Sequence, residues 1–133
     1  MPTIFSKIVS GEIPCYKIAE TNEFLSFLDV NPLNAGHALV IPKKETDYIF
    51  DMTDSEFASL HLFAKIVAGA IRKVIPCKRI GVAVIGLEVP HAHIHLVPIN
   101  NIGDLNFDRE RVKLTPEEFA SIAEKIRAQL LAP

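Results

Sequence analysis

The stretch His91-Ala92-His93-Ile94-His95-Leu96-Val97-Pro98 places three histidines at alternate positions, and it holds three of the five histidines of the chain. Side chains two residues apart on a strand point to the same face of a sheet, so this spacing predicts three imidazoles on one face and apolar side chains on the other. Imidazole is the side chain that titrates nearest neutral pH. The cluster therefore indicates a site for proton transfer, nucleophilic attack or metal binding.

Three interpretations of the cluster remain open on the residues alone. Imidazoles at alternate strand positions can bind zinc or iron, and His37 on another predicted strand offers a further ligand. In covalent catalysis, a central imidazole attacks an electrophile while its neighbours fix its tautomer and bind the developing charge. In a purely structural interpretation, all three are core histidines with satisfied hydrogen bonds.

The composition is that of one ordinary domain. The chain has 133 residues, 49% of them apolar, and a formal net charge of −2. Because no basic run appears among its 14 Lys and Arg residues, we do not expect a nucleic acid partner. No apolar stretch approaches 18 residues, so we expect no membrane partner. The isolated Cys15 and Cys77, and a start without a signal-peptide pattern, predict a cytoplasmic setting.

The pattern of apolar residues, turn residues and helix caps predicts an α+β fold. We expect helices over 4–10, over about twenty residues after Thr53 and after Thr115-Pro116, and strands over 16–20, 24–29, 37–41, 81–85 and 93–99. The order α-β-β-β-α-β-β-α favours a mainly antiparallel five-stranded sheet with one long helix, a short N-terminal helix and a C-terminal helix.

The long helix has a wide apolar surface. Its core stripe consists of Phe57, Leu60, Ala64, Val67, Ile71 and Val74. The apolar surface extends further through Leu62, Phe63, Ile66 and Ala70. A helix on one small sheet needs only a single apolar face, so the excess predicts a homodimer. The alternative is that the C-terminal helix covers it.

The sequence resembles the histidine-triad (HIT) family of nucleotide hydrolases and transferases, whose motif is His-φ-His-φ-His-φ-φ with φ apolar. Residues 91–97 match that motif completely. Residues 4–14 resemble the opening of the Hint branch, and residues 36–43 resemble the strand that brings the fourth active-site histidine. The matching core covers residues 4–99. The resemblance implies a single HIT domain over 1–133 with a C-terminal helical extension over about 104–133.

The resemblance also implies catalytic roles for four histidines. His93 would be the nucleophile that attacks an α-phosphorus and forms a nucleotidyl-histidine intermediate. His91 and its backbone would orient the site. His95 and His37 would contact the phosphate and assist departure of the leaving group.

Further positions match the nucleotide-binding part of the family pattern. Asp29 corresponds to the acidic residue that binds ribose hydroxyls, and a carboxylate accepting two hydroxyl donors is a sensible physical match. On the residues alone, Asp29 could equally be a turn residue. The apolar slot for the base would be formed by Ile4, Phe5, Ile8 and Phe27, each of which could also be a core residue.

The chain departs from the family pattern at two places. Where Hint proteins have Gly-Gln and a hydroxyl residue, it has Gly86, Leu87 and Glu88. Leucine offers no hydrogen-bond donor, whereas Glu88 could contact the leaving group and, if buried, act as a general acid. Thr3 and Ser6 occupy the places of a zinc-binding Cys-x-x-Cys in some members, so we expect neither a metal nor any other cofactor.

The expected function is hydrolysis at the α-phosphate of a purine nucleoside monophosphate conjugate, as in a nucleoside phosphoramidase. Within the same family, the alternatives are a dinucleoside polyphosphate hydrolase and a nucleotidyltransferase. From other classes, the alternatives are a histidine-based metalloenzyme and a non-catalytic nucleotide-binding protein.

Overall fold

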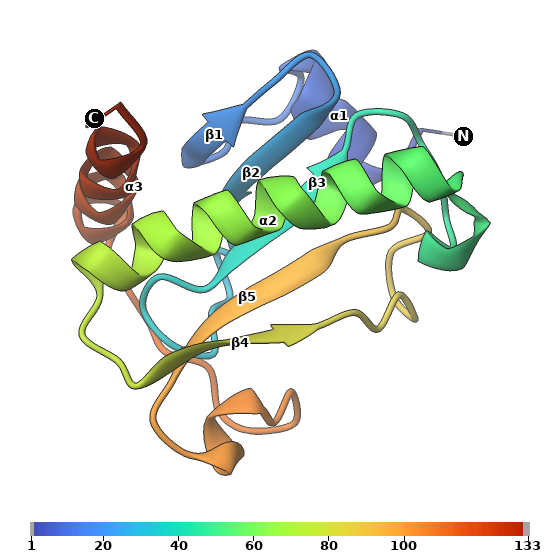
Figure 1. The fold of residues 1–133 in the computed structure, drawn as a ribbon. Coiled ribbons are helices and arrows are strands. Elements are labelled where there is room, and N and C mark those ends of the chain that lie inside the picture. The colour runs from blue at the N-terminus through green and yellow to red at the C-terminus, as the bar shows by residue number, and fades with distance from the viewer. Residues whose placement is uncertain (1, 132–133) are drawn as a thin grey trace.

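The structure, a computed structural model, describes residues 2–131. Its elements are α1 (Ile4–Ser10), β1 (Lys17–Glu20), β2 (Phe24–Leu28), β3 (Ala38–Pro42), α2 (Asp54–Val74), β4 (Arg79–Ala83), β5 (Ile94–Ile99) and α3 (Pro116–Leu131) (Figure 1). The strands form one antiparallel sheet in the order β1-β2-β3-β5-β4. This confirms the predicted α+β fold. Across residues 2–131, no helix combines the length and the apolar character needed to cross a lipid bilayer.

The three helices begin at threonine caps. The hydroxyl oxygens of Thr3, Thr53 and Thr115 accept the backbone N–H three residues further on, at 2.9, 3.1 and 3.1 Å. These bonds satisfy donors that the first helical turn leaves without a partner. Gly11, with φ of 87°, ends α1 in the left-handed conformation that glycine adopts most readily. The caps explain why short sequence signals place the helices correctly.

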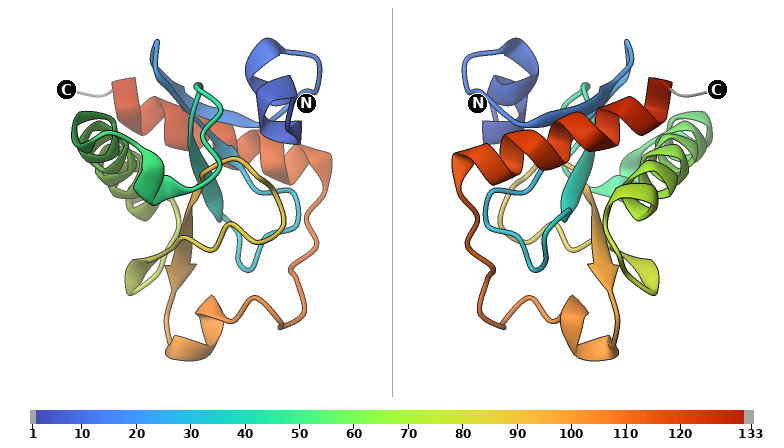
Figure 2. Two further views of the ribbon diagram at one scale, coloured as in Figure 1. Left: turned by 90° about the vertical axis from the view of Figure 1, so that its right-hand side faces the viewer. Right: turned by 90° about the vertical axis from the view of Figure 1, so that its left-hand side faces the viewer.

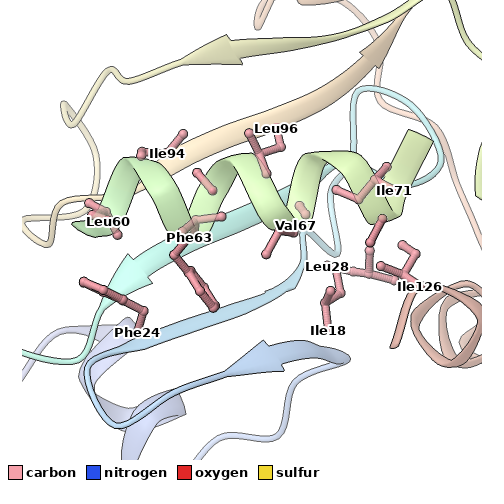
Figure 3. Close-up of a cluster of buried hydrophobic side chains, with 14 of the residues drawn as sticks. Ile18, Phe24, Leu28, Leu60, Phe63, Val67, Ile71, Ile94, Leu96 and Ile126 are labelled. Atoms are coloured by element: carbon pink, nitrogen blue, oxygen red, sulfur yellow. The ribbon is translucent and has the colours of Figure 1, made fainter. Parts of the chain in front are cut away.

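The main core lies between one face of the sheet and the helices α2 and α3. In Figure 3 the long helix α2 lies across the strands, and its apolar side chains point toward those of the sheet. The buried side chains labelled there are Ile18, Phe24, Leu28, Leu60, Phe63, Val67, Ile71, Ile94, Leu96 and Ile126. Because side chains alternate along a strand, the strand residues between these core positions face the other side of the sheet.

That other side carries a smaller apolar cluster and the helix α1. Figure 2 shows α1 and α2 on opposite sides of the sheet. The buried members of the smaller cluster are Phe5, Leu25, Phe27, Leu39 and Ile41. The candidate site opens on this side.

The histidine stretch is not one continuous strand, which corrects the sequence prediction. β5 begins at Ile94, so only His95 lies on the strand and His93 lies before it. The pairing of β3 with β5 runs no further than Val40 opposite Ile94. Because proline has no N–H to donate, Pro42 at the end of β3 cannot continue the ladder with β5, although it still pairs with Phe24 of β2. The preceding strand is also displaced, since β4 spans Arg79–Ala83 rather than 81–85.

The apolar surface that α2 leaves outside the core is smaller than predicted. Phe63 and Ala70 are buried in the main core. Leu62 and Ile66 remain 62% and 61% exposed. The case for a homodimer therefore depends on these two side chains and on the sheet edge at β4.

Candidate active site

A cavity of about 490 Å³ opens on the α1 side of the sheet and contains His93 and His95. The predicted site residues that line it are Ile4, Phe5, Ile8, Phe27, Asp29, Glu88, His93 and His95. His37 and His91 are fully buried and do not line it. The four histidines therefore divide into two that line the cavity and two that do not.

The hydrogen bonding of His93 determines which of its nitrogens can react. Its Nδ1 lies 2.7 Å from the backbone carbonyl oxygen of His91, which can only accept a hydrogen bond. Nδ1 therefore carries the proton in the neutral ring, and Nε2 keeps a free lone pair. The ring of Phe5 packs edge-on against His93 with 5.0 Å between centroids and restricts its orientation.

His91 is fixed by two hydrogen bonds on opposite sides of its ring. Nε2 donates to the carbonyl oxygen of Pro42 at 2.8 Å, so Nδ1 accepts from the hydroxyl of Thr3, also at 2.8 Å. Burial lowers the pKa of His91, which keeps the ring neutral. Thr3 thus both caps α1 and orients the first histidine of the triad. Sequence reasoning noted Thr3 only as a replacement for cysteine.

His37 and His95 form a directed pair. The backbone N–H of Leu33 donates to Nδ1 of His37 at 3.0 Å, so the proton of neutral His37 is on Nε2. That Nε2 lies 2.9 Å from Nδ1 of His95 and donates to it, which leaves the proton of neutral His95 on its own Nε2. Burial lowers the pKa of His37 to about 3 and that of His95 to about 4, so both rings are neutral at neutral pH.

Asp29 lies beside this pair because β2 and β3 are neighbours. Its backbone N–H donates to the carbonyl oxygen of His37 at 2.9 Å. Its carboxylate accepts from the backbone N–H of Asn31 at 2.8 Å and lies 3.6 Å from Nε2 of His37. Burial raises the pKa of the Asp29 carboxyl. The carboxylate lines the cavity and has room to accept further donors.

Gly36 makes the sharp entry into β3 that positions His37. Its φ is 90°, and a Cβ there would lie 2.7 Å from Cγ1 of Ile75. Only glycine combines this conformation with this close approach.

The four apolar residues of the predicted base slot all line the cavity, but they differ in exposure. Phe5 and Phe27 are buried and pack edge-on with 5.8 Å between ring centroids. Ile4 is half-exposed, and Ile8 is partly buried. The phenylalanines therefore belong to the core of the site, whereas the isoleucines are accessible to a ligand.

Glu88 lines the cavity but is exposed to solvent. Leu87, the neighbour expected to bury it, is 88% exposed. The condition set for a general acid, a carboxyl buried between Leu87 and Val89, is therefore not met.

One group of side chains has the spacing of a metal site. A carboxylate oxygen of Asp29 and one ring nitrogen each of His37 and His95 lie within 4.8 Å of one another. A metal ion on Nε2 of His37 would move the proton of that ring to Nδ1. There it would face the N–H of Leu33, so two donors would oppose each other and one buried hydrogen bond would be lost. The tautomers fit a hydrogen-bonded pair better than a metal centre.

Three lining residues come from a segment that sequence reasoning treated only as a polar, charged connection. They are Phe107, Asp108 and Arg111. The ring of Phe107 packs edge-on against His95, with 4.7 Å between centroids. This segment has no helical or strand periodicity, so the sequence carried no signal for its position.

Comparison with known proteins shows the family of the chain. The HIT domain family model matches residues 10–102. Adenosine 5'-monophosphoramidase hnt1 of Schizosaccharomyces pombe is 35% identical over 133 residues, which cover 98% of this chain and 99% of that protein. A zinc-bound histidine triad family protein from Mycobacterium smegmatis has 30% identity and a TM-score of 0.81, with 96% of this chain and 91% of that one covered. A Hit-like protein from Bartonella henselae has 27% identity and the same TM-score over 96% and 95% of the two chains. The chain belongs to the HIT family.

Proposed function

We propose that this protein is a nucleotide hydrolase that cleaves the bond between the α-phosphate of a purine nucleoside monophosphate and its leaving group, with phosphoramidates as the main substrate class. The observation that carries the proposal is the 2.7 Å contact between Nδ1 of His93 and the carbonyl oxygen of His91, which leaves Nε2 of a cavity-lining imidazole free to attack. The likeness to a protein named as an adenosine 5'-monophosphoramidase supports this choice of substrate.

The nucleoside would be held by groups on both sides of the cavity. The carboxylate of Asp29 can accept hydrogen bonds from two ribose hydroxyls. Ile4 and Ile8 offer apolar surface to a base. The buried rings of Phe5 and Phe27 pack beneath this apolar surface. This arrangement would place the α-phosphate next to His93 and His95.

The reaction would proceed in two displacements. In the first, the lone pair on Nε2 of His93 forms a bond to the α-phosphorus while the bond from phosphorus to the leaving group breaks, and the departing atom takes its proton from solvent. The proton on Nε2 of His95 remains there and donates a hydrogen bond to a phosphoryl or leaving-group atom. In the second, water attacks the phosphorus, the bond to His93 breaks, and a proton of the water returns to solvent.

The test is a substrate panel assayed with wild-type protein and the His93→Asn variant. The panel contains adenosine phosphoramidate, adenylylated lysine and diadenosine polyphosphates, compared by kcat/KM. We expect the highest value for a substrate with a P–N bond and a loss of about 10³-fold or more in His93→Asn, with AMP binding retained. His61→Asn is the matched control, since His61 lies on α2 and does not line the cavity.

The outcome also separates the alternatives. A preference for diadenosine polyphosphates would indicate the dinucleoside polyphosphate hydrolase, and transfer to a second nucleotide or sugar phosphate would indicate the transferase. Binding without turnover of any substrate would indicate a non-catalytic nucleotide-binding protein. Hydrolysis within about tenfold of wild type in His93→Asn would refute the assignment of the nucleophile.

A further inference from the structure

The segment 104–112, which follows the histidine strand, is fixed against the loop that supports His37. Three hydrogen bonds tie it to the carbonyl oxygens of the consecutive residues 31–33. The donors are the guanidinium groups of Arg111 and Arg109 and the backbone N–H of Val112. The segment, which contributes three residues to the cavity lining, is therefore held in a fixed position.

Within this segment, Arg111 is held in one orientation. Its guanidinium donates to the carbonyl oxygens of Asn31 at 2.7 Å and of Phe107 at 3.1 Å. The guanidinium carbon also lies 5.6 Å from the centroid of the Phe107 ring, and this ring packs against His95. A guanidinium has five N–H donors, so several remain for a ligand. The side chain is thus already ordered before a ligand arrives, which reduces the entropy lost on binding.

Arg111 gives the cavity a cationic group for an anionic ligand. Among the described residues, Arg111 is the only Lys or Arg that lines the cavity, together with the acidic Asp29, Glu88 and Asp108. His95 contributes no positive charge at neutral pH, because burial lowers its pKa to about 4. A phosphoryl group carries at least one negative charge, and the negative charge on its oxygens increases during nucleophilic attack. Arg111 is the group positioned to balance it.

We propose that Arg111 binds an anionic phosphoryl oxygen of the substrate. This oxygen belongs either to the α-phosphate or to a phosphate of the leaving group. Arg111 would supply N–H donors that Leu87, in the place of a glutamine, lacks. The inference deepens the proposed function, which supplies the identity of the ligand as a nucleotide.

The experiment measures binding, so it does not depend on turnover. Dissociation constants are determined by calorimetry for adenosine, AMP and the methylene analogue of ADP, with wild-type protein and with Arg111→Met. Methionine keeps an apolar stem over Phe107 but removes the charge. We expect AMP and the ADP analogue to bind about 10- to 100-fold more weakly, with adenosine unchanged, if Arg111 binds the α-phosphate. A loss confined to the ADP analogue would assign it to the leaving-group phosphate.

Two further variants separate a direct contact from a structural role. Lys113→Met removes a positive charge at an exposed position directly after the segment. Lys113 does not line the cavity, so this change should alter no affinity. Arg111→Lys keeps the charge without the guanidinium fork and should recover part of the loss. Unchanged affinities in Arg111→Met, an equal loss for adenosine, or no binding of either nucleotide to the wild type would overturn the inference. Absence of hydrolysis with the expected binding pattern would refute the proposed function alone.

Discussion

Nε2 of His37 lies 2.9 Å from Nδ1 of His95, and the N–H of Leu33 on the far side of His37 decides that the proton lies between them and belongs to His37. Together with the bonds from His91 to Pro42 and from His93 to His91, this relationship assigns a single neutral tautomer to each of the four histidines. The triad is therefore a set of oriented donors and acceptors built on buried rings.

The first prediction concerns the pH dependence of stability. The folded pKa values of His37, about 3, and His95, about 4, lie below the unfolded value of about 6.5. Below pH 6.5 the unfolded chain binds protons that the folded chain does not, so stability is fully present above this pH and is lost as the pH falls. Each such histidine lowers the free energy of unfolding by up to about 1.4 kcal/mol per pH unit.

Urea denaturation at pH 7.5, 6.5 and 5.5 measures this effect, within a window in which the carboxylates of the unfolded chain hardly titrate. The His95→Asn variant should show a shallower slope, because one of the contributing histidines is gone. A free energy of unfolding that is flat across the window would mean that these histidines are charged in the folded protein.

The second prediction is that activity needs no metal. The hydrogen bond from Leu33 to Nδ1 of His37 leaves the ring proton on Nε2, where a metal would have to bind. In addition, Thr3 and Ser6 occupy the places of the zinc-binding cysteine pair. Treatment with EDTA followed by gel filtration should leave kcat/KM unchanged, with no stoichiometric metal in elemental analysis. A bound metal whose removal stops hydrolysis and whose return restores it would establish the metalloenzyme instead.

Homodimer formation is the third prediction. Leu62 and Ile66 are exposed on α2, and β4, with Val82 56% exposed, pairs on one side only among the described strands. Pairing between copies would protect this edge. Sedimentation equilibrium at micromolar concentration should give twice the chain mass of 14.7 kDa.

The double variant Leu62→Glu with Ile66→Glu should sediment as a monomer. Lys65→Glu, an exposed charge reversal on the same helix, is its control and should remain a dimer. A wild-type protein that sediments at 14.7 kDa would rule out the dimer at this concentration.

The fourth prediction is that Glu88 is not a general acid. Such catalysis typically contributes about 10²- to 10⁴-fold and would require a carboxyl buried beside the leaving group, whereas Glu88 is exposed to solvent. Glu88→Gln should therefore change kcat/KM by less than about threefold, both for a phosphoramidate and for an aryl ester with a good leaving group.

Glu110→Gln, a change at an exposed position that does not line the cavity, serves as the control for Glu88→Gln. A large loss on the phosphoramidate alone would restore Glu88 as the proton donor.

The sequence predicted the fold well because its signals are local. Threonine caps, Gly11 and alternating apolar residues each act within a few positions, and they place the helices and most strand ends to within about two residues. The strand containing His95 begins later than predicted because its pairing depends on Pro42, which is about fifty residues away in sequence. Local alternation could not show this.

The same limit applies to the site. The family resemblance identified the four histidines, and the structure links all four: His37 bonds to His95, the rings of His95 and His93 pack together, and His93 bonds to the backbone of His91. It could not reveal Arg111 or Phe107, because the segment that carries them is held at the cavity by hydrogen bonds to a loop about eighty residues earlier. The assignment of residues 104–133 to an extension of the same single domain stays a prediction, since the family model ends at residue 102.

The central claim, covalent catalysis through His93, is tested most directly by the configuration at the α-phosphorus of the product. A substrate whose α-phosphorus is made chiral by isotopic or sulfur substitution is hydrolysed, and the configuration of the nucleotide product is determined. Each in-line displacement inverts the phosphorus, so attack by His93 followed by attack by water predicts net retention. Net inversion would show a single displacement by water and would contradict the account.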